Sequence, residues 1–232
     1  MKLVLIGGGE IGKSGYAYET RDIDQEIVKF SGKENPNLLF IGFASSSSDS
    51  YYDLVKKVFT ELGCSCANLK RKNALNNPQI VKDKINNADI IYIGGGDTLK
   101  LMDDIYQFGI DKLLSGAMDR GCVIAGISAG AILISKKGFS DSYILRGESD
   151  KYSFIDGLGF ADISICPHYH KYPSKDIELF DSVLDEKDAV YALENCTALK
   201  IEDGNISVIR SMDNAKAYLI SYNDKVIEKV IE

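Results

Sequence analysis

A serine between glycines is the residue best suited to chemistry in this sequence. Ser128 lies in Gly126-Ile127-Ser128-Ala129-Gly130, after the apolar run Val123–Ala125 and before a short helical pattern, Ala131–Ile134. A strand-to-helix turn of this form exposes the serine oxygen, and its small neighbours permit the tight backbone. The amides at the start of the next helix favour negative charge on an attacked oxygen. We predict that Ser128 is a nucleophile; an ordinary glycine-rich turn is the alternative.

The base for this serine has few candidates. A serine hydroxyl is a weak nucleophile without a base, and the only two histidines are His168 and His170. Both follow the strand-like run Ile163–Cys166, and catalytic groups gather at the carboxyl ends of strands in parallel sheets. A pair of surface histidines or a metal pair would give the same pattern. Because no further ligands cluster nearby, we predict no metal site.

Two acidic residues compete to orient the histidine. Glu194 follows the strand-like run Ala189–Leu193, and Asp141 comes thirteen residues after the serine. The orienting residue of a catalytic triad must reach the far side of the imidazole. Sequence position alone does not decide which of the two residues orients the histidine.

Two glycine-rich segments follow other predicted strands. Gly94-Gly95-Gly96 comes after Ile90–Ile93, and its amides are suited to form half of an oxyanion hole, with Asp97 or Thr98 capping the next helix. Gly7–Gly12 satisfies the dinucleotide pattern G-x-G-x-x-G. The next strand, Leu38–Phe43, ends without the acidic residue that holds a ribose, so we predict no cofactor. A dinucleotide-binding oxidoreductase, or a non-catalytic small-molecule-binding protein, stays the alternative.

The elements that must position these residues alternate along the chain. Apolar strand-like runs are separated by helical patterns at Tyr51–Leu62, Ile80–Ile85, Thr98–Phe108 and Ile110–Arg120. This order predicts an α/β fold, a mostly parallel sheet covered by helices on both faces. The C-terminal part is rich in short β runs, with a hairpin signal at Asp203–Gly204, and predicts an antiparallel appendage or edge on that sheet. With no clear linker, we expect one domain, residues 1–232.

Composition excludes several classes of protein. The formal net charge of −7 argues against a nucleic-acid or anionic-membrane partner. The sequence has no run of eighteen apolar residues and no signal-peptide pattern, so we expect neither a membrane span nor export. The five cysteines are scattered, which is typical of free thiols in a reducing cytoplasm. We therefore expect a cytoplasmic protein; its oligomeric state is left open.

The motifs taken together resemble the dipeptidase E family of serine peptidases, related to cyanophycinase. The segments that carry the resemblance, in order, are Ile93–Thr98, Gly126–Ala131, Cys166–Tyr169 and Ala192–Leu199. The resemblance implies a fold like that of the class I glutamine amidotransferases, with serine in place of the amidotransferase cysteine. It also implies roles for individual residues: Ser128 as nucleophile, His168 as base, Glu194 as the third member, with Asp141 near an aspartate also proposed for that role, and the amides of Gly96 and Ala129 as the oxyanion hole.

The same resemblance implies a small peptide substrate with an N-terminal aspartate. An aspartyl side chain needs a cation, and Arg146, Lys171 and Lys175 are the candidates near the motifs. Lys175 falls roughly where the family has an arginine, and lysine offers a point charge rather than a bidentate fork. His170 shares a face with His168 on an extended chain and is expected to shape the pocket. We predict at most a moderate preference for aspartate.

Overall fold

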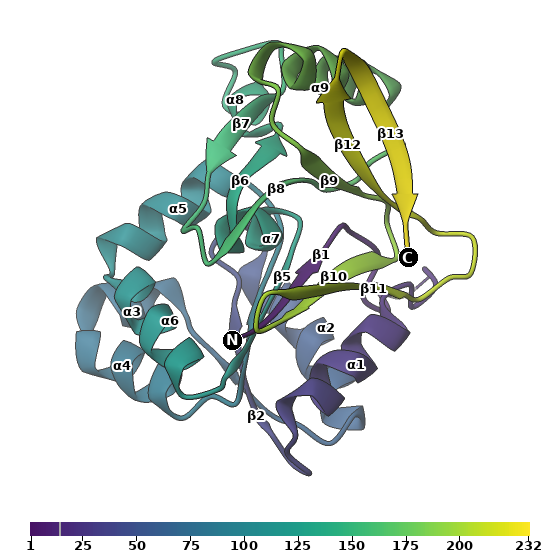
Figure 1. Ribbon diagram of the computed structural model, residues 1–232. Helices are drawn as coiled ribbons and strands as arrows, with labels where there is room; N and C mark the ends of the chain where they lie inside the picture. Colours follow the sequence, from purple (N-terminus) through teal and green to yellow (C-terminus); the bar gives the residue numbers. More distant parts are fainter. Residues whose placement is uncertain (14) are drawn as a thin grey trace.

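The chain forms two sheets. The computed structural model describes residues 1–13 and 15–232. One sheet has seven strands and the other has six, and Figure 1 shows the six-stranded sheet above the seven-stranded one. A single mostly parallel sheet was expected, so the second sheet corrects that expectation.

The seven-stranded sheet has the order β11-β10-β1-β5-β4-β2-β3. Its strands are β1 (Lys2–Ile6), β2 (Asn37–Ile41), β3 (Ser65–Asn68), β4 (Ile90–Ile93), β5 (Val123–Ile127), β10 (Thr197–Glu202) and β11 (Asn205–Arg210). The five strands β1, β5, β4, β2 and β3 are parallel to their neighbours in this order. Strands β10 and β11 add an antiparallel edge. The central strands β4 and β5 are buried along their whole length, as expected for parallel strands covered on both faces, whereas the edge strand β3 is only partly buried.

Helices cover this sheet on both sides. They are α1 (Arg21–Ser31), α2 (Ser48–Glu61), α3 (Arg71–Asn76), α4 (Pro78–Asn86), α5 (Thr98–Gln107) and α6 (Ile110–Asp119). Along β1, Val4 and Ile6 pack in the cluster that contains the apolar residues of α1 and α2, whereas Leu3 and Leu5 pack in the cluster of α4, α5 and α6. Successive side chains of a strand point to opposite faces, so β1 contributes to both layers of the core.

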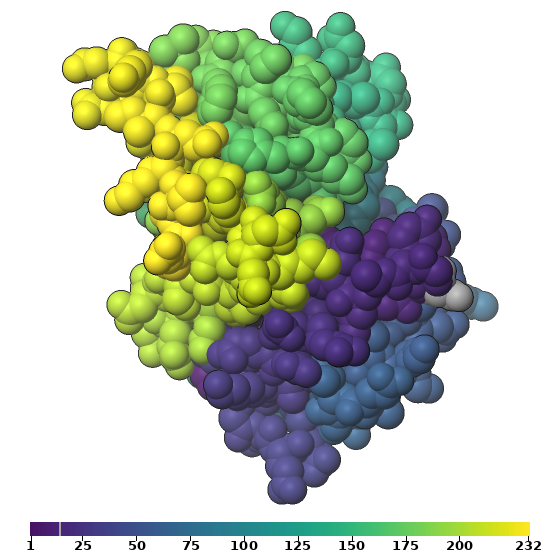
Figure 2. Space-filling view, turned by 90° about the vertical axis from the view of Figure 1, so that its right-hand side faces the viewer, coloured from purple at the N-terminus to yellow at the C-terminus, as the bar shows by residue number. Residues whose placement is uncertain are grey.

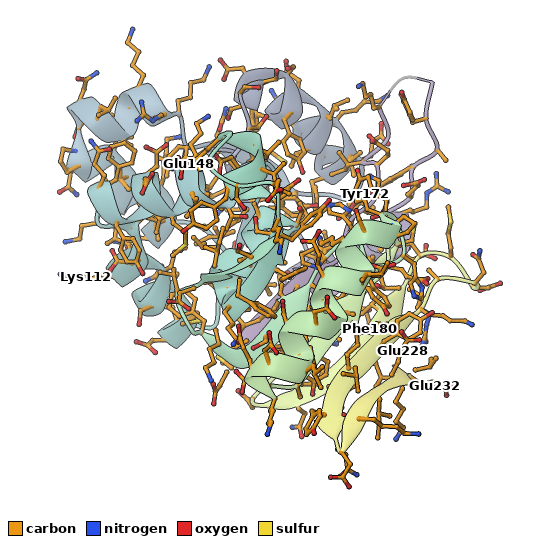
Figure 3. All side chains as sticks on the ribbon, turned by 90° about the horizontal axis from the view of Figure 1, so that it is seen from above. Lys112, Glu148, Tyr172, Phe180, Glu228 and Glu232 are labelled. Carbon is orange, nitrogen blue, oxygen red and sulfur yellow. The ribbon has the colours of Figure 1, made fainter. Side chains whose placement is uncertain are left out.

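The six-stranded sheet has the order β13-β12-β9-β8-β6-β7. Its strands are β6 (Ser135–Ser140), β7 (Ser153–Asp156), β8 (Ala161–Cys166), β9 (Val190–Leu193), β12 (Ala217–Asn223) and β13 (Lys225–Ile231). Strands β6, β8 and β9 are parallel, and the other pairs are antiparallel. Helix α9 (Pro173–Glu186) lies beside β12 and β13, as Figure 3 shows, and α8 (Ser142–Leu145) follows β6. The short helix α7 (Ala129–Ile134) is buried and contacts strands of both sheets.

The C-terminal strands are divided between the two sheets. The expected hairpin at Asp203–Gly204 is confirmed, because Glu202 pairs with Asn205 across it. This hairpin, β10–β11, extends the first sheet, whereas β9, β12 and β13 belong to the second. Figure 2 shows the result on the surface, where the yellow-green C-terminal segment lies against the purple N-terminal segment. Within the described residues, no helix combines the length and the apolar character that crossing a membrane requires.

Candidate active site

Ser128 lies on a strained turn between β5 and α7. Its backbone has φ 54° and ψ −112°, which a non-glycine residue seldom adopts. A Cβ on Gly126 would lie 2.3 Å from the Gly130 carbonyl oxygen, and a Cβ on Gly130 would lie 2.3 Å from the Ile93 carbonyl oxygen. Both glycines of the G-x-S-x-G pattern are therefore required for the turn to pack against β4.

His168 faces this serine. Its Nε2 lies 3.0 Å from Ser128 Oγ, and its backbone has a φ of 54° in the turn after β8. Burial lowers the pKa of His168 to about 4, and the hydrogen bond with Asn195 opposes this shift. The imidazole is therefore neutral at pH 7, the state in which it can accept a proton from a serine.

The other imidazole nitrogen contacts an asparagine. His168 Nδ1 lies 2.8 Å from Asn195 Oδ1. Because an amide oxygen only accepts hydrogen bonds, Nδ1 carries the proton and Nε2 is left to accept from the serine hydroxyl. Sequence reasoning missed Asn195. The available signal was its place one residue after Glu194, at the same sheet edge as the histidines.

Glu194 is turned toward the other histidine. Its Oε1 lies 3.0 Å from His170 Nδ1 and accepts a hydrogen bond from Tyr218 at 3.1 Å, and its Oε2 accepts one from the backbone amide of Lys216 at 2.8 Å. The expected pairing of Glu194 with His168 is therefore not found, and Asn195 occupies that position. Successive side chains at a strand end point in opposite directions, so adjacent residues serve different histidines.

The first glycine run holds the three catalytic segments together. The successive carbonyls of residues 6–8 accept hydrogen bonds from the backbone amides of Ser128, His168 and Cys196, at 3.0, 3.0 and 2.9 Å. The third amide follows Asn195 directly. These hydrogen bonds thus join the turns that carry Ser128, His168 and Asn195.

His168 and Asn195 pack so closely against this segment that Gly8 has no room for a side chain. A Cβ on Gly8 would lie 2.3 Å from Asn195 Oδ1 and 2.4 Å from His168 Nδ1. A dinucleotide site needs a helix that begins directly after the glycines, but α1 begins only at Arg21. The run therefore lacks the structural context of a dinucleotide-binding loop.

The second glycine run passes beside the serine. A Cβ on Gly95 would lie 3.2 Å from Ser128 Cβ, and one on Gly96 would lie 2.4 Å from the Ala44 carbonyl oxygen. Asp97 caps α5, as one of the two expected caps. Ala129 is the first residue of α7, where backbone amides have no acceptor within the helix. Gly95 thus lies against Ser128 on one side, and Ala129 follows the serine directly in the chain.

Two cavities meet at the serine and the histidine. The larger, about 490 Å³, is lined by residues 9–13 and by the segment 45–51, in which α2 begins. The smaller, about 220 Å³, contains Asp141 and Lys175. Ser128, His168 and Gly96 border both cavities. A substrate that fills both would have its central bond at Ser128.

The expected specificity residues lie in different surroundings. Lys175 is 4% exposed, and its Nζ donates a hydrogen bond to the Pro167 carbonyl oxygen at 2.7 Å. His170 is 42% exposed and lies between Glu194 and Glu228 rather than on either cavity wall. Figure 3 shows Glu228 on the hairpin beside α9 and Tyr172 at the start of that helix.

The other two cations are less available for a substrate. Arg146 is paired with Asp97 and Asp103, and the Lys171 ammonium lies 5.4 Å from the centre of the Tyr172 ring. Within residues 1–13 and 15–232, no three His, Cys, Asp or Glu side chains are grouped as a metal site.

Each comparison with known proteins matches this chain to peptidases. The model of peptidase family S51 matches residues 3–209. The peptidase YgaJ of Bacillus subtilis is 28% identical over 99% of this chain and 96% of its own length. Peptidase E of Nostoc sp. is 28% identical over 96% of this chain and 90% of its own length. The crystal structure of a peptidase from an acI-B1 actinobacterium shares the fold, with a TM-score of 0.71 and 21% identity, over all of this chain and 96% of that one.

Proposed function

Because the chain belongs to peptidase family S51 and is a serine-type peptidase, we propose that it hydrolyses short peptides with Ser128 as nucleophile and His168 as base. The observation that carries this proposal is the 3.0 Å contact between Ser128 Oγ and His168 Nε2 where the two cavities meet.

The reaction proceeds through an acyl-enzyme. Ser128 Oγ attacks the scissile carbonyl while His168 Nε2 takes the hydroxyl proton. The carbonyl oxygen becomes an oxyanion and accepts hydrogen bonds from the amides of Gly96 and Ala129. His168 then gives its proton to the leaving amine as the C–N bond breaks. Water, deprotonated by the same histidine, hydrolyses the ester and restores Ser128. Asn195 keeps the proton of the neutral imidazole on Nδ1 throughout.

The smaller cavity receives the N-terminal residue of the substrate. An ammonium group has three donors, and one donor of the buried Lys175 is used by the Pro167 carbonyl. The remaining donors suit a substrate carboxylate, and Asp141 in the same cavity suits a free α-ammonium group. A volume of about 220 Å³ supports a single side chain here, with the rest of the peptide in the larger cavity. An N-terminal aspartate fits this pair of charges.

Labelling with a fluorophosphonate probe tests the nucleophile. Wild-type protein should react, and Ser128→Ala should lose both the label and hydrolysis, with a rate loss on the order of 10⁴–10⁶. Ser47→Ala is the matched control, because Ser47 also borders the larger cavity and should leave labelling unchanged. Hydrolysis that persists in purified Ser128→Ala would refute the assignment.

Comparing kcat/KM for Asp-X, Asn-X and Ala-X peptides tests the smaller cavity. We expect a moderate aspartate preference, about tenfold, that disappears in Lys175→Met, because the substitution removes the charge and keeps the buried stem. Lys171→Met is the control on an exposed lysine. An aspartate preference that survives Lys175→Met would mean that another group meets the carboxylate.

A further inference from the structure

Two short segments face each other beside the catalytic histidine. Residues 168–170 lie in the turn after β8, and residues 193–195 lie at the end of β9 and just after it. Each residue of the first segment contacts one residue of the second: His168 Nδ1 lies 2.8 Å from Asn195 Oδ1, the Tyr169 amide donates to the Leu193 carbonyl oxygen at 2.9 Å, and His170 Nδ1 lies 3.0 Å from Glu194 Oε1. The contact that orients the base is thus one of three links between the two segments.

The first of these segments has a strained backbone. His168 and His170 have φ values of 54° and 59°, in the left-handed region that residues other than glycine seldom adopt. Such conformations persist only where the surrounding contacts hold them. The position of His168 therefore depends on the contacts that hold its neighbours in the turn.

Glu194 is a fixed partner for this turn. Its Oε2 accepts a hydrogen bond from the Lys216 amide at 2.8 Å, its Oε1 accepts one from the Tyr218 hydroxyl at 3.1 Å, and β12, which carries Tyr218, pairs with β9. Because a carboxylate only accepts hydrogen bonds, His170 Nδ1 carries a proton and donates it to Glu194. This hydrogen bond attaches the strained turn to a side chain that is held by a neighbouring strand.

Neither partner of this hydrogen bond reaches the substrate cavities. Among the described residues that line the two cavities at Ser128, neither His170 nor Glu194 occurs. Their contact can therefore affect the reaction only through the turn that carries His168.

We propose that His170 and Glu194 are positioning residues for the catalytic base. Their hydrogen bond holds the strained turn against the end of β9, so that His168 Nδ1 stays on Asn195 Oδ1 and Nε2 faces Ser128. A misplacement of about 1 Å at a catalytic group costs on the order of 10² in rate. This inference rests on the proposed serine-peptidase function and adds two residues that touch no reacting atom.

The pair His170→Asn and His170→Asp tests the inference. The two new side chains have the same shape and tolerate a left-handed backbone, but only the amide has a donor in the place of Nδ1, whereas the carboxylate is repelled by Glu194. We expect His170→Asp to lower kcat about tenfold with KM within about threefold, because the turn moves and the cavities do not. His170→Asn should stay within about twofold of wild-type kcat, because the hydrogen bond to Glu194 is kept.

Nuclear magnetic resonance of the protein labelled with ¹⁵N-histidine gives a readout that does not depend on hydrolysis. The chain has only two histidines, so His168 is the only imidazole left in either variant. Its two nitrogen shifts report which nitrogen carries the proton. We expect the proton on Nδ1 in wild type and in His170→Asn, and a mixture of the two tautomers in His170→Asp, where the contact with Asn195 is loosened.

Glu228→Gln is the control for charge. Glu228 lies 4.0 Å from His170 Nε2, on β13 rather than at the end of β9. Its substitution removes a carboxylate beside the same histidine and leaves the link between the two segments, so kcat and the His168 tautomer should match wild type.

Several results would overturn the proposal. Wild-type kcat or an unchanged His168 tautomer in folded His170→Asp would do so, as would equal losses in the two His170 variants or in Glu228→Gln. If His170→Asp does not fold, Glu194→Ala removes the same hydrogen bond from the other side, and wild-type kcat there would also overturn the proposal. Failure of the peptidase function itself would appear separately, as wild-type protein without hydrolysis.

Discussion

The side chain that contacts Nδ1 of His168 is uncharged. In the Ser-His-Asp arrangement a carboxylate both orients the imidazole and stabilises the imidazolium that forms. Asn195 supplies the orientation through its amide oxygen but no negative charge. The imidazolium is then stabilised less than it would be beside a carboxylate. Burial lowers the pKa of His168, and the hydrogen bond with Asn195 opposes this shift only in part.

This pairing predicts an unusual pH profile. The base must be neutral to act, so kcat/KM should rise with pH through an apparent pKa of about 4 and be constant from there to neutral pH. Asn195→Asp should move that acidic limb upward by about 1–3 units, because a carboxylate beside the imidazole favours its protonated form.

Glu194→Gln is the matched control for this profile. It changes the neighbouring residue, whose carboxylate contacts His170 instead, so the acidic limb should stay near its wild-type position. A limb that moves with Glu194→Gln and not with Asn195→Asp would return the orienting role to Glu194. Kinetic profiles between pH 3.5 and 8, with a check of folding at each pH, distinguish these results.

At the scale of elements, the first glycine run is the most sensitive part of the site. Gly8→Ala should reduce kcat/KM more than about 100-fold, because the added methyl group overlaps both His168 and Asn195 and a displacement of about 1 Å costs that much. The measurement is steady-state kinetics alongside thermal unfolding.

Gly12→Ala is a control that distinguishes the effect of this steric overlap from the effect of backbone strain. Gly12 also has a positive φ, 71°, but a Cβ there meets its nearest atom at 3.7 Å, an ordinary contact. We expect Gly12→Ala to lose stability without a comparable loss of activity per folded molecule. Similar kinetic losses in both variants would mean that the conformation of the run, and not the contact with the triad, controls activity.

Elements with a strong local pattern could be predicted from the sequence. The predicted strand Ile90–Ile93 matches β4 to the residue, and the predicted turn at Asp203–Gly204 joins β10 and β11, since apolar runs and turn residues carry their own signal. Strand β6 was missed, because Ser135–Ser140 contains two lysines and a glycine and alternates poorly. Its conformation depends on pairing with β7 and β8, which no local pattern reveals.

The same distinction holds for the candidate site: residues with a local motif could be predicted, and a residue placed by distant contacts could not. Ser128, with its glycines, carries a local motif. His168 was limited to two choices by composition. The third member depends on which of two adjacent side chains turns inward at the end of β9, and that is decided by the hydrogen bonds of Lys216 and Tyr218 to Glu194. Contacts that arise from the second sheet were outside the reach of the sequence pattern.

At the scale of the whole molecule, the two sheets are joined around the catalytic residues. Ser128 follows β5 of the seven-stranded sheet, whereas His168 and Asn195 follow β8 and β9 of the six-stranded sheet. The site therefore exists only where the sheets meet. The chain has a net charge of −7, yet the ammonium of Lys175 is buried at this junction. We therefore expect the buried ammonium of Lys175, and not the average charge, to decide which side chain the smaller cavity prefers.

The backbone carbonyls of residues 6–8 have a consequence for protein synthesis. They lie at the end of β1 and just after it, but one of their donors is Cys196, which follows Ser128 and His168 in the sequence, and β1 also pairs with β10. A nascent chain that has already exposed Ser128 on the ribosome still lacks Asn195 and the strands that align it. Such distant contacts form late in folding. We therefore expect a chain that stops before β9 to lack peptide hydrolysis, although it contains Ser128 and its glycines.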